Sequence, residues 1–230
     1  MQIRSRLRTK TAALTAAALC ACGALLLCGC SAKPQMTDYV SEYRSHIYEG
    51  TQGEYSVFAA FSRREYPYLA DGCVGKMQDL FEIAVTVPDN TKTYAIRFGC
   101  GGKEYEAELS YNSVEMTHEC SLSLPEPAEN AIDFTVTAEE EEGVSVQAAD
   151  MRGEGALELA PLLERVQAAC PDTFSALTSG RSFAGEVYVR LLCEDERRFF
   201  YVGVTDREGK TASMLADAAT GEVLATRDGT

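Results

Sequence analysis

The stretch Phe81-Glu82-Ile83-Ala84-Val85-Thr86-Val87 places a large apolar residue at every second position and ends at Pro88-Asp89-Asn90. Side chains of a β-strand point alternately to the two faces of its sheet, so this pattern is typical of a strand with one buried face. Residues 94–98 and 105–109 repeat the alternation on either side of the turn Gly99-Cys100-Gly101-Gly102. The pattern predicts neighbouring strands joined by short turns.

Similar runs surround this segment on both sides. They occupy residues 55–61, 114–124, 132–136 and 144–147. Many short strands separated by turn residues are typical of an all-β sandwich or barrel, and no long helical pattern supplies the crossovers that parallel strands require. The size favours an immunoglobulin-like or fibronectin-like architecture, although the Cys…Trp…Cys signature of immunoglobulin domains is absent. We therefore expect a mainly β chain with an antiparallel β-sandwich over residues 38–149.

The start of this region has a different period. Tyr39, Tyr43 and Ile47 recur at a spacing of four, and Thr37 can cap a helix. The spacing predicts a short helix over residues 37–48, in front of the first strand.

Glycine and charged residues gather over residues 150–155, where the pattern changes. A helical period follows at Leu157, Leu159, Leu162, Leu163 and Val166. A second short helix is expected near residues 174–177. Four short strands come next, over residues 183–193, 199–205, 211–215 and 222–226. The sequence thus predicts a small α+β domain over residues 150–230, with a helix packed on an antiparallel meander.

The chain opens with a basic segment followed by an apolar one. Arg4, Arg6, Arg8 and Lys10 come first without an acidic residue, and residues 11–27 consist largely of Ala and Leu. This order is typical of a secretory signal. The apolar run is shorter than the roughly 20 residues that a membrane-spanning helix needs, which disfavours an uncleaved membrane helix.

Leu27-Cys28-Gly29-Cys30 resembles the bacterial lipobox, in which an aliphatic residue, a small residue and Gly or Ala precede a lipidated cysteine. The resemblance implies a signal peptide over residues 1–29, cleavage before Cys30, and a short tether over residues 30–37. It also implies more than one acyl chain on Cys30, which stable attachment requires, and a place on the outer side of the cell membrane. The alternative is an ordinary secretory signal with an incidental cysteine.

The chain is strongly acidic, with 35 Asp and Glu against 21 Lys and Arg and a net charge of −14. Cleavage before Cys30 would remove four basic residues and no acidic one, which brings the net charge to about −18. Such a charge argues against nucleic acid as a partner and against docking to anionic lipid through a basic patch. The expected contact with the membrane is the lipid on Cys30.

Five further cysteines are Cys73, Cys100, Cys120, Cys170 and Cys193. They are widely spaced, without a C-x-x-C pair, and most lie within apolar patterns. Buried free thiols behave as small apolar residues, so we favour these over a disulfide framework.

Known signatures of catalysis are absent from the sequence. It contains no phosphate loop, dinucleotide fingerprint, serine-hydrolase elbow or H-E-x-x-H helix. His118 and Cys120 would share one face of a strand, and Cys73 or Cys100 could join them around zinc, but structural zinc sites use closed pairs of ligands. We therefore expect no catalytic residue, metal or cofactor.

The segment Arg63-Arg64-Glu65-Tyr66-Pro67-Tyr68 combines two Arg with two Tyr around a Pro. Arg and Tyr are enriched in binding hot spots, and loops often carry the function of a β-sandwich. Arg63, Arg64, Tyr66 and Tyr68 are therefore candidate binding residues. In the alternative interpretation, Tyr66 and Tyr68 fold back and plug the end of the sandwich.

Near the C-terminus, Tyr201-Val202-Gly203-Val204-Thr205-Asp206, Gly209-Lys210-Thr211 and Asp217-Ala218-Ala219-Thr220-Gly221-Glu222-Val223-Leu224 resemble the end of a PepSY-type domain. In that family a strand ends in an Asp-x-x-Thr-Gly-Glu turn, which here consists of Asp217, Thr220, Gly221 and Glu222. Gly221 would supply a positive φ, while Asp217 and Thr220 would bond the turn backbone. PepSY-type domains are exported modules associated with binding or restraining peptidases, so the resemblance implies a peptidase as a partner.

Three functions are compatible with these patterns. The favoured one is a lipid-anchored envelope binding or interaction protein without catalytic activity. The second is a peptidase inhibitor or chaperone-like modulator that acts through the PepSY-like region. The third is an enzyme with an unrecognised site that includes His118 or Cys120.

Overall fold

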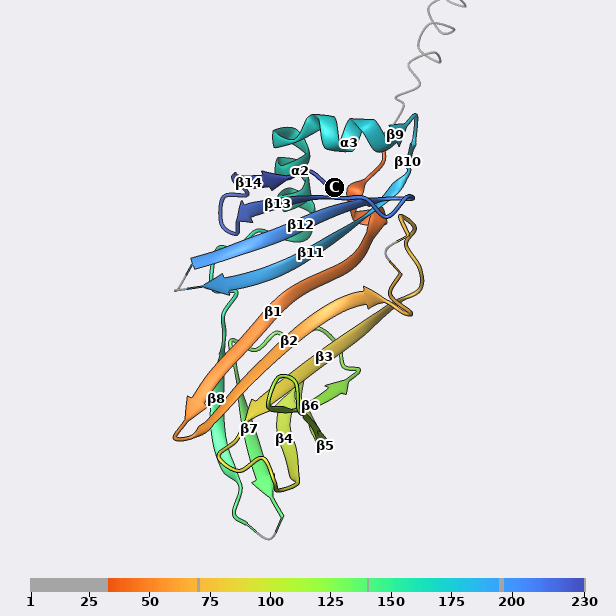
Figure 1. Ribbon diagram of the computed structural model, residues 1–230. Helices are drawn as coiled ribbons and strands as arrows, with labels where there is room; N and C mark the ends of the chain where they lie inside the picture. Colours follow the sequence, from red (N-terminus) through yellow and green to blue (C-terminus); the bar gives the residue numbers. More distant parts are fainter. Residues whose placement is uncertain (1–32, 70, 140, 195–196, 230) are drawn as a thin grey trace, which may run out of the picture. The chain divides into compact units, whose positions relative to one another are not determined.

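The computed structural model describes residues 33–69, 71–139, 141–194 and 197–229 (Figure 1). Residues from Pro34 onward form one compact unit. The predicted signal peptide and Cys30 lie outside the described residues. In the part of the chain that is described, no helix has the length and apolar character needed to cross a membrane.

Eight of the described strands close into a barrel in the order β1-β2-β3-β6-β5-β4-β7-β8. Their bounds are β1 (Val40–Gln52), β2 (Tyr55–Glu65), β3 (Met77–Thr86), β4 (Tyr94–Cys100), β5 (Lys103–Asn112), β6 (Thr117–Leu122), β7 (Ala131–Ala138) and β8 (Val144–Asp150). The ring closes where β8 pairs with β1, Tyr48 opposite Asp150 and Glu49 opposite Ala149. The strand pairs within the ring are antiparallel.

The expectation of a β-sandwich is therefore wrong, although the expectation of a mainly β, antiparallel fold is confirmed. A register shift between Arg44 and His46 makes a bulge in β1. A bulge bends and twists a strand, which lets one long strand pair with β2 along one edge and with β8 along the other. Closure of the ring satisfies the backbone groups that a sandwich would leave at the two edges.

The interior of the barrel is a packed apolar core. Phe81, Ile83 and Val85, from the stretch that opened the sequence, are fully buried within it. Ring centroids of Phe81 and Phe98 lie 5.6 Å apart, and those of Phe98 and Phe134 lie 5.0 Å apart. An eight-stranded barrel is just narrow enough for side chains to fill it, which is the case here.

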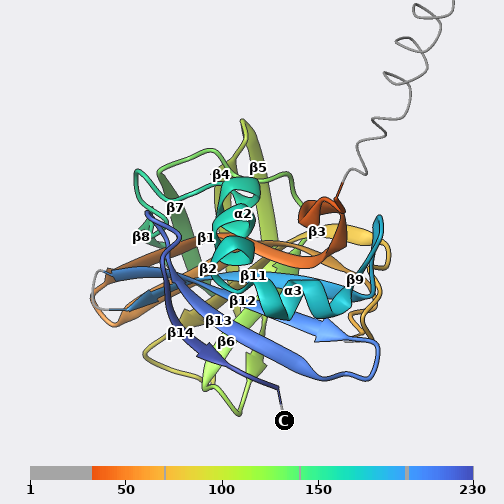
Figure 2. The same cartoon turned by 90° about the horizontal axis from the view of Figure 1, so that it is seen from above.

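The C-terminal part forms an antiparallel meander covered on one face by helices. Its strands are β11 (Gly185–Glu194), β12 (Arg197–Asp206), β13 (Thr211–Asp217) and β14 (Val223–Arg227). The helices α2 (Leu159–Ala169) and α3 (Pro171–Leu177) lie over this sheet (Figure 2), and a small β9–β10 hairpin follows (Thr178–Ser179 and Ser182–Phe183). Leu162, Val166 and Phe174 pack with Val189 and Val202 in a second core.

The two halves are joined through β1. Its first residues, Val40 to Arg44, pair in parallel with Val187 to Arg190 of β11, so the barrel sheet and the meander are continuous. The sequence did not predict a parallel pair, because the connection between these two strands is the whole barrel rather than one crossover helix.

The helix expected over residues 37–48 is wrong. Only Met36–Tyr39 is helical, as a short 3-10 helix (η1), and β1 begins at Val40. A spacing of four is compatible with a strand as well as with a helix, because four is a multiple of the two-residue period of a strand. In the structure Tyr43 and Ile47 both belong to β1 and both contact the second core.

A substitution at Gly50 would test whether the barrel is closed between β1 and β8. A Cβ atom at Gly50 would lie 2.2 Å from the carbonyl oxygen of Gln147 on β8, so Gly50→Val should force β1 and β8 apart. We expect the free energy of unfolding, measured by urea denaturation, to fall by about 3 kcal/mol. Gly53→Asn is the matched control, because Gly53 has φ +60° with open space around it, and Asn tolerates that conformation. Equal stability of the two variants would contradict the closed ring.

Candidate functional site

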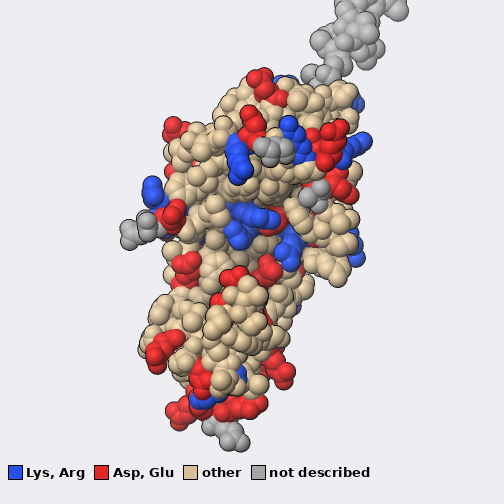
Figure 3. Space-filling model, in the orientation of Figure 1, with Lys and Arg blue, Asp and Glu red and all other residues tan. Residues whose placement is uncertain are grey.

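A groove of about 420 Å³ lies on the sheet face opposite the helices. Its lining comes from both halves of the molecule: Glu42, Arg44, Ser62, Arg64, Glu82, Arg190, Leu192 and Tyr201. Figure 3 shows basic side chains gathered near the middle of this face, on a molecule that is otherwise rich in acidic residues. We call this surface the arginine groove.

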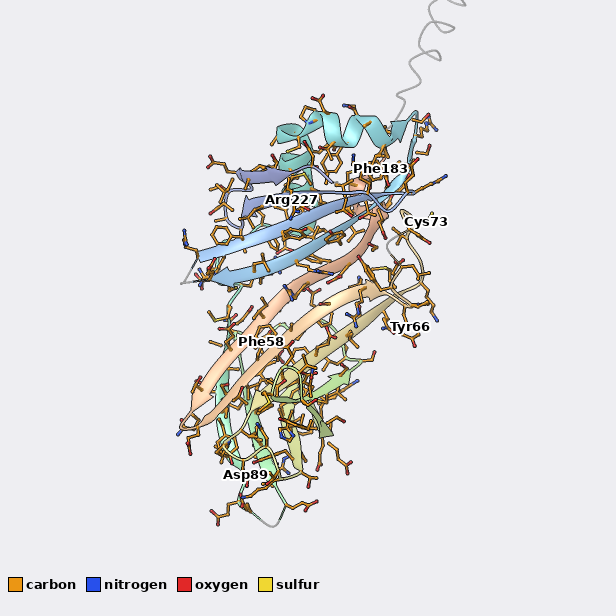
Figure 4. All side chains as sticks on the ribbon, in the orientation of Figure 1. Phe58, Tyr66, Cys73, Asp89, Phe183 and Arg227 are labelled. Atoms are coloured by element: carbon orange, nitrogen blue, oxygen red, sulfur yellow. The ribbon has the colours of Figure 1, made fainter. Side chains whose placement is uncertain are left out.

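Strand alternation places the groove residues on one face. Arg190 and Leu192 of β11 point to the groove. The alternating residues Val189 and Leu191 point to the opposite face, into the helix-covered core. On β2, Ser62 and Arg64 share the groove face with Phe58, which is 39 % exposed farther along the strand (Figure 4).

Two of the three arginines are paired with carboxylates. Arg190 donates from Nε and Nη2 to the two carboxylate oxygens of Glu42, at 2.8 and 2.7 Å, and Glu42 is buried. Arg64 donates from Nη2 to Oε1 of Glu82 at 3.3 Å. The first pair has the bidentate geometry of a strong charge-assisted contact, whereas the second is a single, longer contact.

Arg44 differs from both. Its Nε donates to the backbone carbonyl of Leu191 at 3.1 Å, which fixes the direction of the guanidinium group. Among the described residues, no carboxylate lies within ion-pair distance of it. Burial lowers the pKa of Arg44, and the repulsion from Arg190 lowers it further, although Glu42 and Glu82 act in the opposite direction. The groove thus holds a guanidinium group that is oriented by the backbone and partly desolvated.

One tyrosine, Tyr201, lines the groove, and a second, Tyr188, lies beside two of the lining residues. The Tyr188 and Tyr201 rings lie 5.8 Å apart, and the Arg190 guanidinium lies 5.2 Å from the centre of the Tyr188 ring. A Cβ atom at Gly203 would come within 2.0 Å of the Tyr188 ring, so glycine is required opposite this tyrosine. The hydroxyl group of Tyr201 is bonded to that of Ser213 at 2.8 Å.

The structure does not bring the four candidate binding residues together on one surface. Arg63 and Arg64 belong to β2 rather than to a loop, and they point to opposite faces. Arg64 lines the groove, whereas Nε of Arg63 pairs with Oδ1 of Asp79 at 2.8 Å on the other face. Tyr66, 69 % exposed on the loop after β2 (Figure 4), does not plug the barrel.

Tyr68 lies nearer to the groove. Burial raises its pKa, with smaller contributions from Glu186 and Glu42 that raise it and from Arg190 that lowers it. The same loop is held by two buried carboxylates: Glu65 accepts from the backbone N–H groups of Leu69 and Gly75, and Glu186 accepts from that of Gly72. These hydrogen bonds tie Leu69 and Gly75 to β2 and Gly72 to β11.

His46 is locked between two carboxylates. Its Nδ1 lies 2.9 Å from Oδ2 of Asp150, and its Nε2 lies 3.5 Å from Oε1 of Glu126, which also accepts from the hydroxyl group of Ser45 at 2.5 Å. Burial alone would lower the pKa of His46, but the two hydrogen bonds raise it to about 9. The hydrogen bond from His46 lowers the pKa of Glu126 to about 2. The hydroxyl group of Ser45 donates to Glu126, and the nitrogens of His46 face Asp150 and Glu126, so these side chains are not arranged as a Ser-His-acid triad.

His118 lies inside the barrel end between Tyr94 and Tyr111, with ring-centre distances of 4.8 and 5.1 Å. Neither ring nitrogen has a hydrogen-bond partner among the described groups, and burial lowers its pKa. Burial also raises the pKa of Cys120, two residues on, to about 11. The described residues contain no group of three or more His, Cys, Asp or Glu arranged to hold a metal ion.

The cysteines of the described chain are free thiols. Cys73 is exposed, whereas Cys100 is buried and Cys120, Cys170 and Cys193 are half-buried. Burial raises the pKa of Cys100 and of Cys193 to about 11, which keeps both as unreactive thiols at neutral pH.

The turn from Asp217 to Glu222, on which the resemblance to a PepSY-type domain depends, is tight and packs against the helix layer. Oδ1 of Asp217 accepts from the N–H of Thr220 at 2.7 Å and from its hydroxyl group at 2.8 Å, and Gly221 has φ +67°. The N–H of Glu222 is 3.3 Å from the Thr220 hydroxyl oxygen. Arg165 of α2 donates to the carbonyl of Thr220, which ties the turn to the helix.

Sequence reasoning missed most of the groove. Glu42 and Arg44 were hidden by the mistaken helix over residues 37–48. Arg190 was visible as a charged residue within the apolar run Val187-Tyr188-Val189-Arg190-Leu191-Leu192. A charge at a half-buried position of a strand is a signal of a partner or a site, but its neighbours across the sheet cannot be identified from one strand.

No protein-family model matches the sequence, and comparisons with curated proteins and with solved structures find no match.

The His46 cluster generates a prediction on pH dependence. Because the folded pKa of His46 is about 9, above the ordinary 6.5, its contribution to stability is full below about pH 6.5 and is lost as the pH rises through 9. We expect wild type to lose about 2 kcal/mol of unfolding free energy between pH 6 and pH 9.5, beyond any change in His46→Gln. Urea denaturation at both pH values measures this difference. Parallel pH profiles of the two proteins would refute the role of His46.

The contribution of Glu126 has the opposite sign. Its folded pKa of about 2 lies below the ordinary 4.5, so its contribution is present above about pH 4.5 and is lost as the pH falls through 2. Glu126→Gln should flatten the acid limb of the stability profile, while Glu139→Gln at an exposed position should not.

Proposed function

We propose that this chain is a binding protein without catalytic activity, held at the outer side of the cell membrane by lipid on Cys30, and that the arginine groove is its binding surface. The observation that carries the proposal is Arg44, a guanidinium group oriented by a backbone carbonyl and left without a carboxylate among the described residues. Such a group costs stability by desolvation, and contact with a partner would compensate that cost.

The composition of the groove supports binding to a partner. Arg and Tyr are enriched at the centres of interfaces. Here Arg44, Arg64 and Arg190 line the groove together with Tyr201, and the Tyr188 ring lies beside Arg190 and Tyr201. The groove rests on paired strands rather than on loops, which preorganises these side chains.

The chemistry of the described residues also favours binding over turnover. Both carboxylate oxygens of Glu42 accept hydrogen bonds from Arg190, and the ring nitrogens of His46 face the carboxylates of Asp150 and Glu126. Both groups are thus engaged within the protein rather than directed at a substrate. The two carboxylates of the groove, Glu42 and Glu82, are both paired with arginines.

The second candidate function is a modulator of a peptidase, acting through the PepSY-like α+β region over residues 150–230. One observation favours it: Tyr201, the first residue of the PepSY-like stretch, lines the groove. In that case the partner at the groove is a peptidase.

Lipidation is tested by labelling. Growth with a radioactive or alkyne-bearing fatty acid should label the wild-type protein and place it in the membrane fraction. Cys30→Ala should abolish both, because the acylated thiol is lost, whereas Cys28→Ala, two residues earlier, should retain both. A label that persists in Cys30→Ala would contradict the anchor.

Groove binding is tested by crosslinking in the native cell. A photoreactive p-benzoylphenylalanine at Leu192, inside the groove, should give a specific crosslinked band. The same group at Leu224, an exposed position on β14, should not. Equal bands at both positions, or none at Leu192, would contradict a binding role for this face.

A further inference from the structure

The arginine groove contains one more positively charged side chain than negatively charged ones. Arg190 is neutralised by Glu42 and Arg64 by Glu82, while Arg44 has no carboxylate partner among the described residues. The five groups together carry one net positive charge. Arg44 of β1 is paired with Arg190 of β11, so their two guanidinium groups repel each other.

An anion beside Arg44 would relieve this repulsion. The Nε of Arg44 is already engaged by Leu191, which leaves the two terminal nitrogens as a fork of donors with a fixed direction. A carboxylate can accept two parallel hydrogen bonds from a guanidinium group, one on each oxygen. Glu42 does so in the same groove through Nε and Nη2 of Arg190, whereas on Arg44 the two terminal nitrogens would be the donors.

The net charge of the groove favours an anion with a single negative charge. A single negative charge would neutralise the groove, whereas a dianion or a polyanion would meet repulsion from Glu42 and Glu82. Tyr201 and Leu192 line the same groove, and the Tyr188 ring lies next to that of Tyr201, at 5.8 Å between ring centres. A volume of about 420 Å³ is within the range of sites for small organic ligands, so a body attached to the anion can be held as well.

We propose that the arginine groove binds a peptide segment through one carboxylate group, which forms a bidentate contact with Arg44 while the adjoining side chains pack on Tyr188, Tyr201 and Leu192. This inference rests on the proposed function and specifies the ligand of the same groove. The carboxylate comes from a chain end or from an acidic side chain of the peptide.

Arg44 is observed directly in the test. In ¹⁵N–¹H spectra of the folded chain from residue 31 onward, the Nε–H of Arg44 is hydrogen-bonded and gives a resonance that reports on its guanidinium group. Four probes are titrated: a pool of N-acetyl tripeptides with a free C-terminus and no acidic residue, the same pool amidated, an amidated pool with a central Glu, and inorganic phosphate.

We expect at least one carboxylate pool to shift the Arg44 resonance with an affinity at least tenfold above that of the amidated pool and of phosphate. The free-terminus pool and the Glu pool distinguish the two sources of the carboxylate. Equal effects of the amidated pool, or tighter binding of phosphate, would overturn the proposal.

Arg44→Met keeps the apolar stem and removes the charge. Binding of the carboxylate pool, followed by the Tyr188 and Leu192 resonances, should weaken at least tenfold in this variant. Arg63→Gln is the matched control, because Arg63 lies on the opposite face, paired with Asp79, and its loss should leave binding unchanged. Equal affinities of Arg44→Met and wild type would overturn the proposal.

A second readout separates binding from a structural role. Since Arg44 is a partly desolvated cation without a carboxylate partner among the described residues, Arg44→Met should unfold at the same temperature as the wild type or at a higher one. A clear fall in the unfolding temperature would show that Arg44 supports the sheet, and the proposal would fail.

The outcomes also separate this inference from the proposed function. A crosslink at Leu192 in cells, together with no response to any carboxylate pool, would leave a groove-binding protein with a different ligand. Absence of the crosslink together with a specific carboxylate response would instead keep the peptide site and remove the protein partner.

Discussion

The pairing of β1 on both of its edges is the constraint on which the rest of the structure depends. Along one edge β1 pairs with β2, and along the other it pairs first with β11 and then with β8. The bulge after Arg44 separates these two uses of the second edge. Because one strand supplies hydrogen bonds to both halves, the barrel core and the helix-covered core are parts of one sheet.

The arginine groove follows from this arrangement. Glu42 and Arg44 lie on the part of β1 that pairs with β11, so Arg190 comes beside them from the C-terminal half and Arg64 from the barrel. Cations from distant parts of the sequence are thus brought together on a strongly acidic molecule. Glu42 is placed to neutralise Arg190, and the same geometry leaves Arg44 without an equivalent partner in the described chain. The fold therefore creates a local positive charge on a chain whose net charge is negative.

The sequence predicts most individual elements correctly, apart from the helix over residues 37–48, but it does not predict how they assemble. The alternation over residues 81–87 and the helical period from Leu157 to Val166 each identified the right element, because periodicity depends only on which side is buried. A sandwich and a barrel share the same alternation, so closure by Tyr48 and Asp150 left no trace in the pattern. In the candidate site, Arg64 was predicted, whereas Arg44 and Arg190 depend on a parallel pair whose partners are more than a hundred residues apart.

Sharing β1 also limits how the chain can be divided. A fragment made of residues 150–230 would keep the meander and its helices but would lose the strand that covers β11. The backbone groups of Val187 to Arg190 would then form a free sheet edge, with Val187 and Val189 on one side of it. Free edges of this kind recruit strands from other molecules, so such a fragment would self-associate or exchange strands between copies. The continuity that builds the groove thus also covers this edge of the C-terminal sheet.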